Sequence, residues 1–410
     1  MSKLITYDQC IELCNLPESP FYETKTMIDG FDVSTFNYRL AQWSDFAKPF
    51  GEESDITGYE LRGLTFVFNK DGSLFKRYLL LKKFFNLNQV PETLYDRVKN
   101  FKIINVNNKE DGSLATFIKL PNGKVVGKSK VGFTNPHSEG INRVYNTNAK
   151  IRNFVNDCLD KDIVPIFEYV APFNRIVLKY SKEELILLKL RDNKTGKYLD
   201  IKDVDIKKAD FETHTLDDII ELSKTVENKE GWVIQMEDID IKIKSEWYMR
   251  LHGLLTDDLY KENVLIKHIL NDDIDDVISK IPEDEKDSID RINALISVVR
   301  NEIKEKTEYY KNEFDKYKEL SIKEYAIKYR KNNEDAHFIL NMKNYEKAKE
   351  LSLEEVESKF ESLEKYELYL ESRNIYNMII DDIKNKTKRL EMAREWLEKK
   401  NYNYTKYNIS

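Results

Sequence analysis

Glycine and proline are distributed very unevenly along this chain of 410 residues. Twelve of the 13 glycines and eight of the 9 prolines precede residue 250. Because these residues mark most turns, a remainder that contains only Gly253 and Pro282 should consist of long helices. The first part is often interrupted and is rich in Val, Ile and Phe, which predicts strands mixed with helices. The sequence therefore predicts two domains, at 1–250 and 251–410.

The first region has many short apolar segments with strand character. A hairpin is expected at 63–68 and 74–81, around the turn at Asp71-Gly72. Further strands are expected at 101–106, 113–119, 124–131, 163–170, 175–179, 185–190, 231–236 and 239–244. Helical patterns at 3–16, 138–160 and 215–225 separate them. This order predicts an α+β domain built on antiparallel sheet.

In the second region, apolar residues recur at helical spacing, as at Ile292, Leu295, Ile296 and Val299. Lysine and glutamate occupy the positions between them, which is typical of amphipathic helices. We therefore expect the C-terminal domain to be all-α.

Charge and composition limit the classes of function. The net charge is −7, and residues 251–410, with 35 acidic and 29 basic side chains, carry −6 of it. This argues against simple electrostatic coating of DNA but leaves room for a local basic cleft. Three cysteines give no disulfide framework, and five scattered histidines give no zinc spacing. With no apolar run of about 18 residues and no apolar signal core, we expect a cytoplasmic protein, by default a monomer.

The segment Lys109-Glu110-Asp111-Gly112-Ser113 lies between the apolar segments FKIINV and LATFI. A lysine at such a junction can act as a nucleophile if burial or neighbouring cations lower the pKa of its amine. Asp-Gly would supply a tight turn that holds the lysine in place. An ordinary polar hairpin turn has the same composition, so the motif alone leaves both interpretations open.

A second motif, Ile-Asp-Ile-Lys-Ile-Lys at 239–244, places Lys242 and Lys244 on the same face of a strand. Two neighbouring ammonium groups could bind a polyphosphate, although a strand face exposed to solvent would have the same residue pattern. Lys128 and Lys130 in GKSKVGF have the same spacing. The overlapping NGKVVGKS lacks the first glycine of a phosphate-binding P-loop and continues as a strand, so a P-loop is not expected.

Carboxylates and cations also occur beside apolar strands. Glu168 in FEYV lies within a strand, where it needs a partner such as Arg175 or a ribose hydroxyl. Glu230 precedes Gly-Trp-Val, and Arg62 and Lys83 each adjoin an apolar segment. Taken singly, each of these positions is ambiguous.

The order of the motifs changes this. KEDG, FEYV, EGWV and IKIK follow one another as in the covalent nucleotidyltransferases, which include DNA ligases, RNA ligases and mRNA capping enzymes. The strings LRGLTF, KKFFNLN, KEDGSL, FEYVAPFNRIVL and IKIKSEWY resemble the bacteriophage RNA ligase 1 family, typified by the T-even phage enzyme. The resemblance covers roughly residues 5–250. It implies an adenylyltransferase domain followed by a helical C-terminal domain.

The resemblance also implies roles for individual residues. Lys109 would form lysyl-AMP, and Lys130 and Glu230 would assist at the active site. The remaining positions would contact ATP: Tyr38, Arg62, Lys83, Glu168, Lys242 and Lys244. A metal-binding aspartate pair aligns on Asp275 and Asp276, with Asp272 and Asp273 close enough to compete for that alignment.

The implied activity is ATP-dependent RNA ligation with Mg²⁺, or Mn²⁺, as cofactor. It would join 5′-phosphate and 3′-OH ends of single-stranded or nicked RNA, as in tRNA repair in the cytoplasm of a phage host. The alternatives are a DNA ligase or capping enzyme of the same superfamily, and a non-catalytic RNA-binding protein. For the last, Tyr309, Tyr310, Phe314 and Tyr317 could stack on bases, although helix core is the commoner reason for such a stripe.

Overall fold

The computed structural model describes residues 4–51, 55–172, 178, 180–237, 239–251, 261–279, 281, 286–331, 333, 335–351, 353–360 and 363–402. The chain forms two compact units. The first comprises Met1–Asp257 and Asp275–Lys280, and the second comprises Asp258–Ile274 and Ile281–Ser410. The expected fold class is confirmed, with antiparallel sheets and helices followed by a helical C-terminal region.

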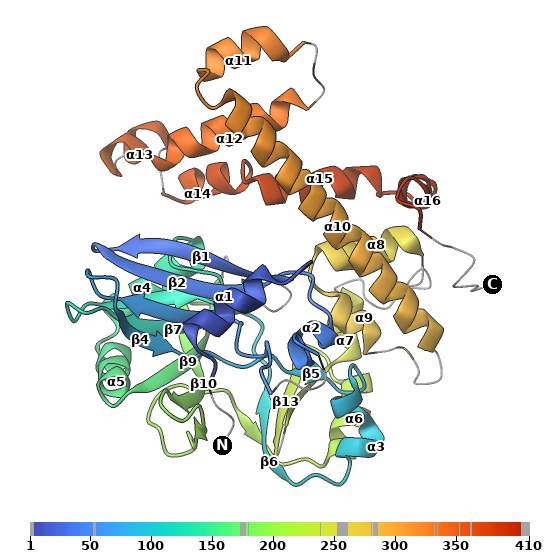
Figure 1. Cartoon of the computed structure of the whole chain (residues 1–410). Coiled ribbons are helices and arrows are strands. Elements are labelled where there is room, and N and C mark those ends of the chain that lie inside the picture. Colours follow the sequence, from blue (N-terminus) through green and yellow to red (C-terminus); the bar gives the residue numbers. More distant parts are fainter. Residues whose placement is uncertain are drawn as a thin grey trace. The chain divides into compact units, whose positions relative to one another are not determined.

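Three sheets form the frame of the first unit (Figure 1). The first, in the order β1-β2-β3-β4, consists of β1 (Phe21–Ile28), β2 (Phe31–Tyr38), β3 (Leu64–Phe68) and β4 (Leu74–Tyr78). The second, in the order β11-β10-β9-β7-β8, consists of β7 (Ser113–Lys119), β8 (Val125–Ser129), β9 (Ile163–Val170), β10 (Glu184–Asp192) and β11 (Tyr198–Leu199). The third, in the order β12-β6-β13-β14-β5, consists of β5 (Phe85–Asn86), β6 (Ile103–Asn108), β12 (Phe211–Glu212), β13 (Gly231–Met236) and β14 (Asp240–Lys244).

The helices of the first unit cover these sheets. They are α1 (Tyr7–Asn15), α2 (Trp43–Ala47), the short 3-10 helix η1 (Pro91–Thr93), α3 (Tyr95–Val98), α4 (Pro136–Thr147), α5 (Ala149–Asp160), α6 (Leu216–Thr225) and α7 (Glu246–Leu251). Helices α4 and α5 pack on the second sheet (Figure 1). Ile141 and Val155 are buried in the core that this sheet forms. The third sheet packs on α6 through Ile219, Trp232 and Ile234. The short α9 (Ile274–Ile278) carries Asp275 and Asp276.

The structure differs from the expectations in a few places. The predicted helix at 138–160 is two helices, because the Asn148 side chain accepts hydrogen bonds from the backbone of Lys150 and Ile151 and caps a new helix. Strands β1 and β2 were not predicted, and β5 pairs with β14 in parallel. The predicted strand at 175–179 lies, apart from residue 178, outside the described residues.

In the second unit, the 32-residue helix α10 (Lys286–Tyr317) packs on α8, α12 and α15. The other helices are α8 (Glu262–Leu270), α11 (Ile322–Tyr329), α12 (Ala336–Lys349), α13 (Leu353–Phe360), α14 (Leu363–Glu371), α15 (Ile375–Lys386) and α16 (Leu390–Glu398). Tyr310 is buried, stacks on Phe338 with ring centroids 4.1 Å apart and donates a hydrogen bond to Asp335. Tyr310 is therefore a core residue, unlike Tyr309, which is half exposed.

No helix among the described residues is long and apolar enough to cross a membrane.

Candidate active site

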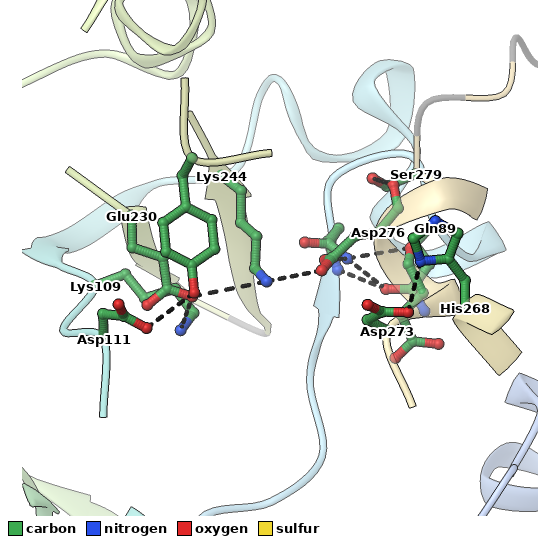
Figure 2. A network of polar contacts seen from close by, with 12 residues as sticks. Gln89, Lys109, Asp111, Glu230, Lys244, His268, Asp273, Asp276 and Ser279 are labelled. Atoms are coloured by element: carbon green, nitrogen blue, oxygen red, sulfur yellow. Dashed lines mark hydrogen bonds and ion pairs between the residues drawn. The ribbon is translucent and has the colours of Figure 1, made fainter. Parts of the chain in front are cut away.

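Lys109 lies where the chain leaves β6 in the third sheet and enters β7 in the second. Its backbone N–H donates to the carbonyl of Gly231 at 3.0 Å, which fixes it beside the start of β13. Its Nζ lies 2.7 Å from Oε1 of Glu230 (Figure 2). We expected cations to crowd this amine, but the structure instead places a carboxylate against it. The side chain of Lys109 remains 23% exposed, so a ligand can reach it.

The turn after Lys109 is clamped by its neighbours. Asp111 is buried, and its carboxylate accepts hydrogen bonds from the Tyr248 hydroxyl at 2.9 Å and the Leu178 N–H at 2.7 Å. A Cβ on Gly112 would lie 2.4 Å from the carbonyl oxygen of Tyr169, so only glycine fits there. The Lys-Glu-Asp-Gly motif indicated the turn, but no pattern in the sequence pointed to Tyr248.

Lys244, at the end of β14, connects two carboxylates. Its Nζ lies 2.7 Å from Oδ2 of Asp276 and 3.7 Å from Oε1 of Glu230 (Figure 2). Glu230 is 3% exposed, and its other oxygen, Oε2, is buried without a hydrogen-bond partner among the described residues. Lys109 and Lys244 therefore both approach Oε1 of Glu230, whereas Oε2 accepts no hydrogen bond from any described residue.

Lys242 shares the face of β14 with Lys244, as the alternating pattern predicts. Burial lowers the pKa of Lys242 to about 8, with Lys83 and Lys244 acting in the same direction and Asp276 and Asp275 opposing them. Among the described residues, no carboxylate lies within ion-pair distance of its amine. Lys242 is thus the cation of this face that could most readily accept an added anion.

Arg62 and Lys83 come from the segments that flank the first sheet. Nη1 of Arg62 is buried and has no hydrogen-bond partner within the described part of the chain. Nζ of Lys83 lies 2.5 Å from Oδ2 of Asp275 and 5.4 Å from the ring centroid of Tyr38. Nζ of Lys130 lies 5.5 Å from the same ring. Tyr38 therefore contacts two of the predicted cations.

Glu168, on β9, faces the Lys109 turn. Burial raises the pKa of its carboxyl to about 8; Lys109 and Arg62 act against this, whereas Glu230 and Glu110 reinforce it. The residue as a whole is intermediate in exposure, and its side chain lies against Gly112 in the Lys109 turn, which places the shielded carboxyl at the site. The predicted alternative partner, Arg175, lies outside the described residues.

Asp275 and Asp276 are both paired with lysines, through Lys83 and Lys244. Asn86 also donates to Oδ1 of Asp276 at 3.2 Å. Although burial acts against ionisation, Lys244 and Lys242 hold the pKa of Asp276 at about 2. Among the described residues, no three histidine, cysteine or acidic side chains gather as a ready metal site. The metal role of the two aspartates stays a prediction.

The structure thus brings all the predicted positions together in the first unit. One residue of interest lay outside our candidates. Lys128 is fully buried, and its Nζ donates to the carbonyl of Gly63 at 2.8 Å and to the Thr65 hydroxyl at 2.9 Å. Its spacing from Lys130 was visible in the sequence, but its burial was not.

Comparison with known proteins agrees with this geometry. A family model described as RNA ligase matches residues 60–248. A protein of Thermovibrio ammonificans named "Putative RNA ligase" is 30% identical over an alignment of 314 positions, and the match covers 72% of this chain and 79% of that protein. The chain belongs to the T4 RNA ligase 1-type family of RNA ligases.

Solved structures of RNA ligases are more distant from this ligase. An archaeal ATP-dependent RNA ligase has a TM-score of 0.42 and 11% identity, covering 67% of this chain and 72% of its own. A lysine-to-alanine variant of the Naegleria gruberi RNA ligase, solved with ATP and Mn, has a TM-score of 0.34 and 16% identity, covering 42% and 58%.

Proposed function

We propose that this RNA ligase uses ATP to join 5′-phosphate and 3′-OH RNA ends through a lysyl-AMP intermediate on Lys109. The pairing of Lys109 with Glu230, beside the cations Arg62, Lys83, Lys242 and Lys244, carries this proposal. A reactive amine next to several cations suits attack on a polyphosphate, because the cations stabilise the charge that develops on the leaving group.

In the first step, Nζ of Lys109 attacks the α-phosphorus of ATP, a P–N bond forms and the bond to pyrophosphate breaks. Glu230 contacts that amine at 2.7 Å, so it can orient the amine and accept its proton. Arg62, Lys83 and the Lys242–Lys244 pair would bind the departing pyrophosphate. Glu168 would accept a hydrogen bond from the ribose, a contact that suits a carboxyl group lining the site.

Two transfers complete the reaction. AMP passes from Lys109 to the 5′-phosphate of RNA and forms a 5′-5′ pyrophosphate linkage. The 3′-OH then attacks that phosphate, the phosphodiester bond forms, and AMP leaves. Tyr38 would lie against the nucleotide, and Lys130, whose Nζ is 5.5 Å from the centroid of the Tyr38 ring, would assist at the active site during these steps.

The residues present fit a divalent cation such as Mg²⁺ or Mn²⁺. Mg²⁺ usually binds through one or two carboxylates together with substrate phosphates, and it would neutralise phosphate charge here. Oε2 of Glu230 is a buried carboxylate oxygen with no hydrogen-bond partner in the part of the chain that the structure describes, which suits this role. Asp275 and Asp276 could join it only if Lys83 and Lys244 turned from them to phosphate.

Labelling with α-³²P-ATP tests the proposal. The wild-type protein should retain acid-stable AMP, and Lys109→Ala should retain none. Equal labelling of the two proteins would show that Lys109 is not the nucleophile. For the metal prediction, Asp275→Asn should change the Mg²⁺ dependence of labelling, and an unchanged dependence would remove Asp275 from the site.

The substrate class needs its own assay. We propose RNA repair, including tRNA repair, because the chain belongs to a family of RNA ligases. A panel of 5′-phosphorylated single-stranded RNAs, nicked anticodon stem-loops and nicked duplex DNA separates the alternatives. Sealing of the DNA alone would contradict the proposal.

A further inference from the structure

Two of the predicted phosphate-binding cations, Arg62 and Lys83, lie on segments without regular secondary structure. Arg62 belongs to the turn at 58–63, and Lys83 follows β4 in the segment at 79–84, which forms neither helix nor strand. No strand ladder therefore fixes either backbone position. A side chain can contact phosphate only if its backbone is correctly positioned. Contacts other than a strand ladder must therefore hold these two segments.

One buried guanidinium group joins both segments. Arg191, near the end of β10, is fully buried. Its Nη1 and Nη2 donate to the two carboxylate oxygens of Glu60 at 2.8 and 2.6 Å, and Nη1 also donates to the carbonyl of Leu80 at 2.5 Å. Glu60 is two residues before Arg62, and Leu80 is three residues before Lys83.

Backbone hydrogen bonds link these anchors to the predicted phosphate-binding residues. The N–H of Lys83 donates to the carbonyl of Tyr59 at 2.9 Å, and the N–H of Arg62 donates to the carbonyl of Glu60 at 2.7 Å. A displacement of Glu60 would therefore move both Arg62 and Lys83. Nη1 of Arg62 has no hydrogen-bond partner among the described residues, so its place depends strongly on the turn that carries it.

The energetics favour a positioning role over simple stabilisation. A buried ion pair loses the hydration of both charges and is often no more stabilising than well-packed apolar side chains. Two parallel hydrogen bonds between arginine and a carboxylate do, however, fix distance and direction together. This pair joins residues 131 positions apart in the chain, close to the two cations whose geometry the reaction needs.

We propose that the Glu60–Arg191 pair is a positioning device that aligns Arg62 and Lys83 with the triphosphate of ATP. Neither Glu60 nor Arg191 contacts the reacting atoms; both act through the backbone of the turn and of the segment at 79–84. This inference rests on the proposed function, in which ATP is the adenylyl donor.

Two conservative variants of the full chain test it. Glu60→Gln keeps the shape of the side chain and removes its charge, and Arg191→Lys keeps the charge and removes the two-pronged geometry. In both, KM for ATP in lysyl-AMP formation should rise about 10-fold, equivalent to about 1.4 kcal/mol. Sealing of pre-adenylylated RNA involves no triphosphate, so its rate should stay within about twofold of wild type.

Arg143→Lys is the matched control, because Arg143 forms a similar two-pronged pair with Glu183 in the same unit. It should leave both measurements unchanged. If KM for ATP is unchanged in Glu60→Gln and Arg191→Lys, the pair is only a structural contact and the inference is wrong. The same conclusion follows if the rates of lysyl-AMP formation and of sealing fall equally. If wild-type protein takes no label from ATP, the proposed function fails and the inference fails with it; a labelled wild type beside variants with unchanged KM refutes the inference alone.

Discussion

Replacement of Glu230 by glutamine should slow lysyl-AMP formation strongly. Oε1 of Glu230 lies 2.7 Å from Nζ of Lys109 and 3.7 Å from Nζ of Lys244. The amide of Glu230→Gln can still turn its oxygen towards Lys109, so the variant loses the negative charge more than the shape. A hydrogen bond to a charged partner contributes about 1.5–3 kcal/mol. If the charge of the carboxylate stabilises the transition state by this amount, its removal corresponds to a rate about 10- to 150-fold lower.

The assay is a single-turnover measurement of AMP transfer from labelled ATP to the protein at saturating ATP and Mg²⁺. Glu237→Gln is the matched control, since Glu237 is exposed just beyond the other end of β13. The control should label at the wild-type rate. A Glu230→Gln rate within about twofold of wild type would refute the idea that this carboxylate orients the amine.

Three further predictions concern other parts of the chain. Burial lowers the pKa of Lys242 to about 8, so its charge is present below that pH and KM for ATP should rise above it; Lys242→Arg should flatten this rise. Tyr248→Phe removes the hydroxyl that donates to Asp111 at 2.9 Å, and lysyl-AMP formation should fall roughly 10-fold, with melting temperature as the check on folding. Lys343 donates to three backbone carbonyls at the end of α10 and just after it, so Lys343→Met should lower the melting temperature while AMP labelling at low temperature persists; loss of labelling in a folded variant would contradict this.

Local pattern was sufficient for much of the fold. The period-two repeat at 239–244 placed Lys242 and Lys244 on one face, and β14 confirms this. The period-two rule did not identify β1, in which several residues are exposed. It also did not identify β2, which is buried on both faces and includes the polar residues Ser34, Thr35 and Asn37. β1 does not alternate between apolar and polar residues, and the alternation in β2 changes phase after Ser34, so neither has the strict period of two that predicts a strand.

For the candidate site, too, the sequence indicated some features and only the structure showed others. The motifs and the family resemblance together identified the residues that the structure brings together, from Tyr38 to Asp276. It did not show that Asp111 would be held by Tyr248, or that Lys128 would be buried against Gly63. Both contacts join residues more than 60 positions apart, and no spacing rule connects such positions.

The sequence by itself determined the helical C-terminal region and the RNA ligase family, because the scarcity of glycine and proline and the order of short motifs are properties of the chain alone. Only the tertiary structure decided which charges meet. Lys109 with Glu230, Lys244 with Asp276 and Arg191 with Glu60 are each paired across long stretches of chain. Coulomb interactions and hydrogen bonds depend on distance in space, and packing of the sheets sets that distance.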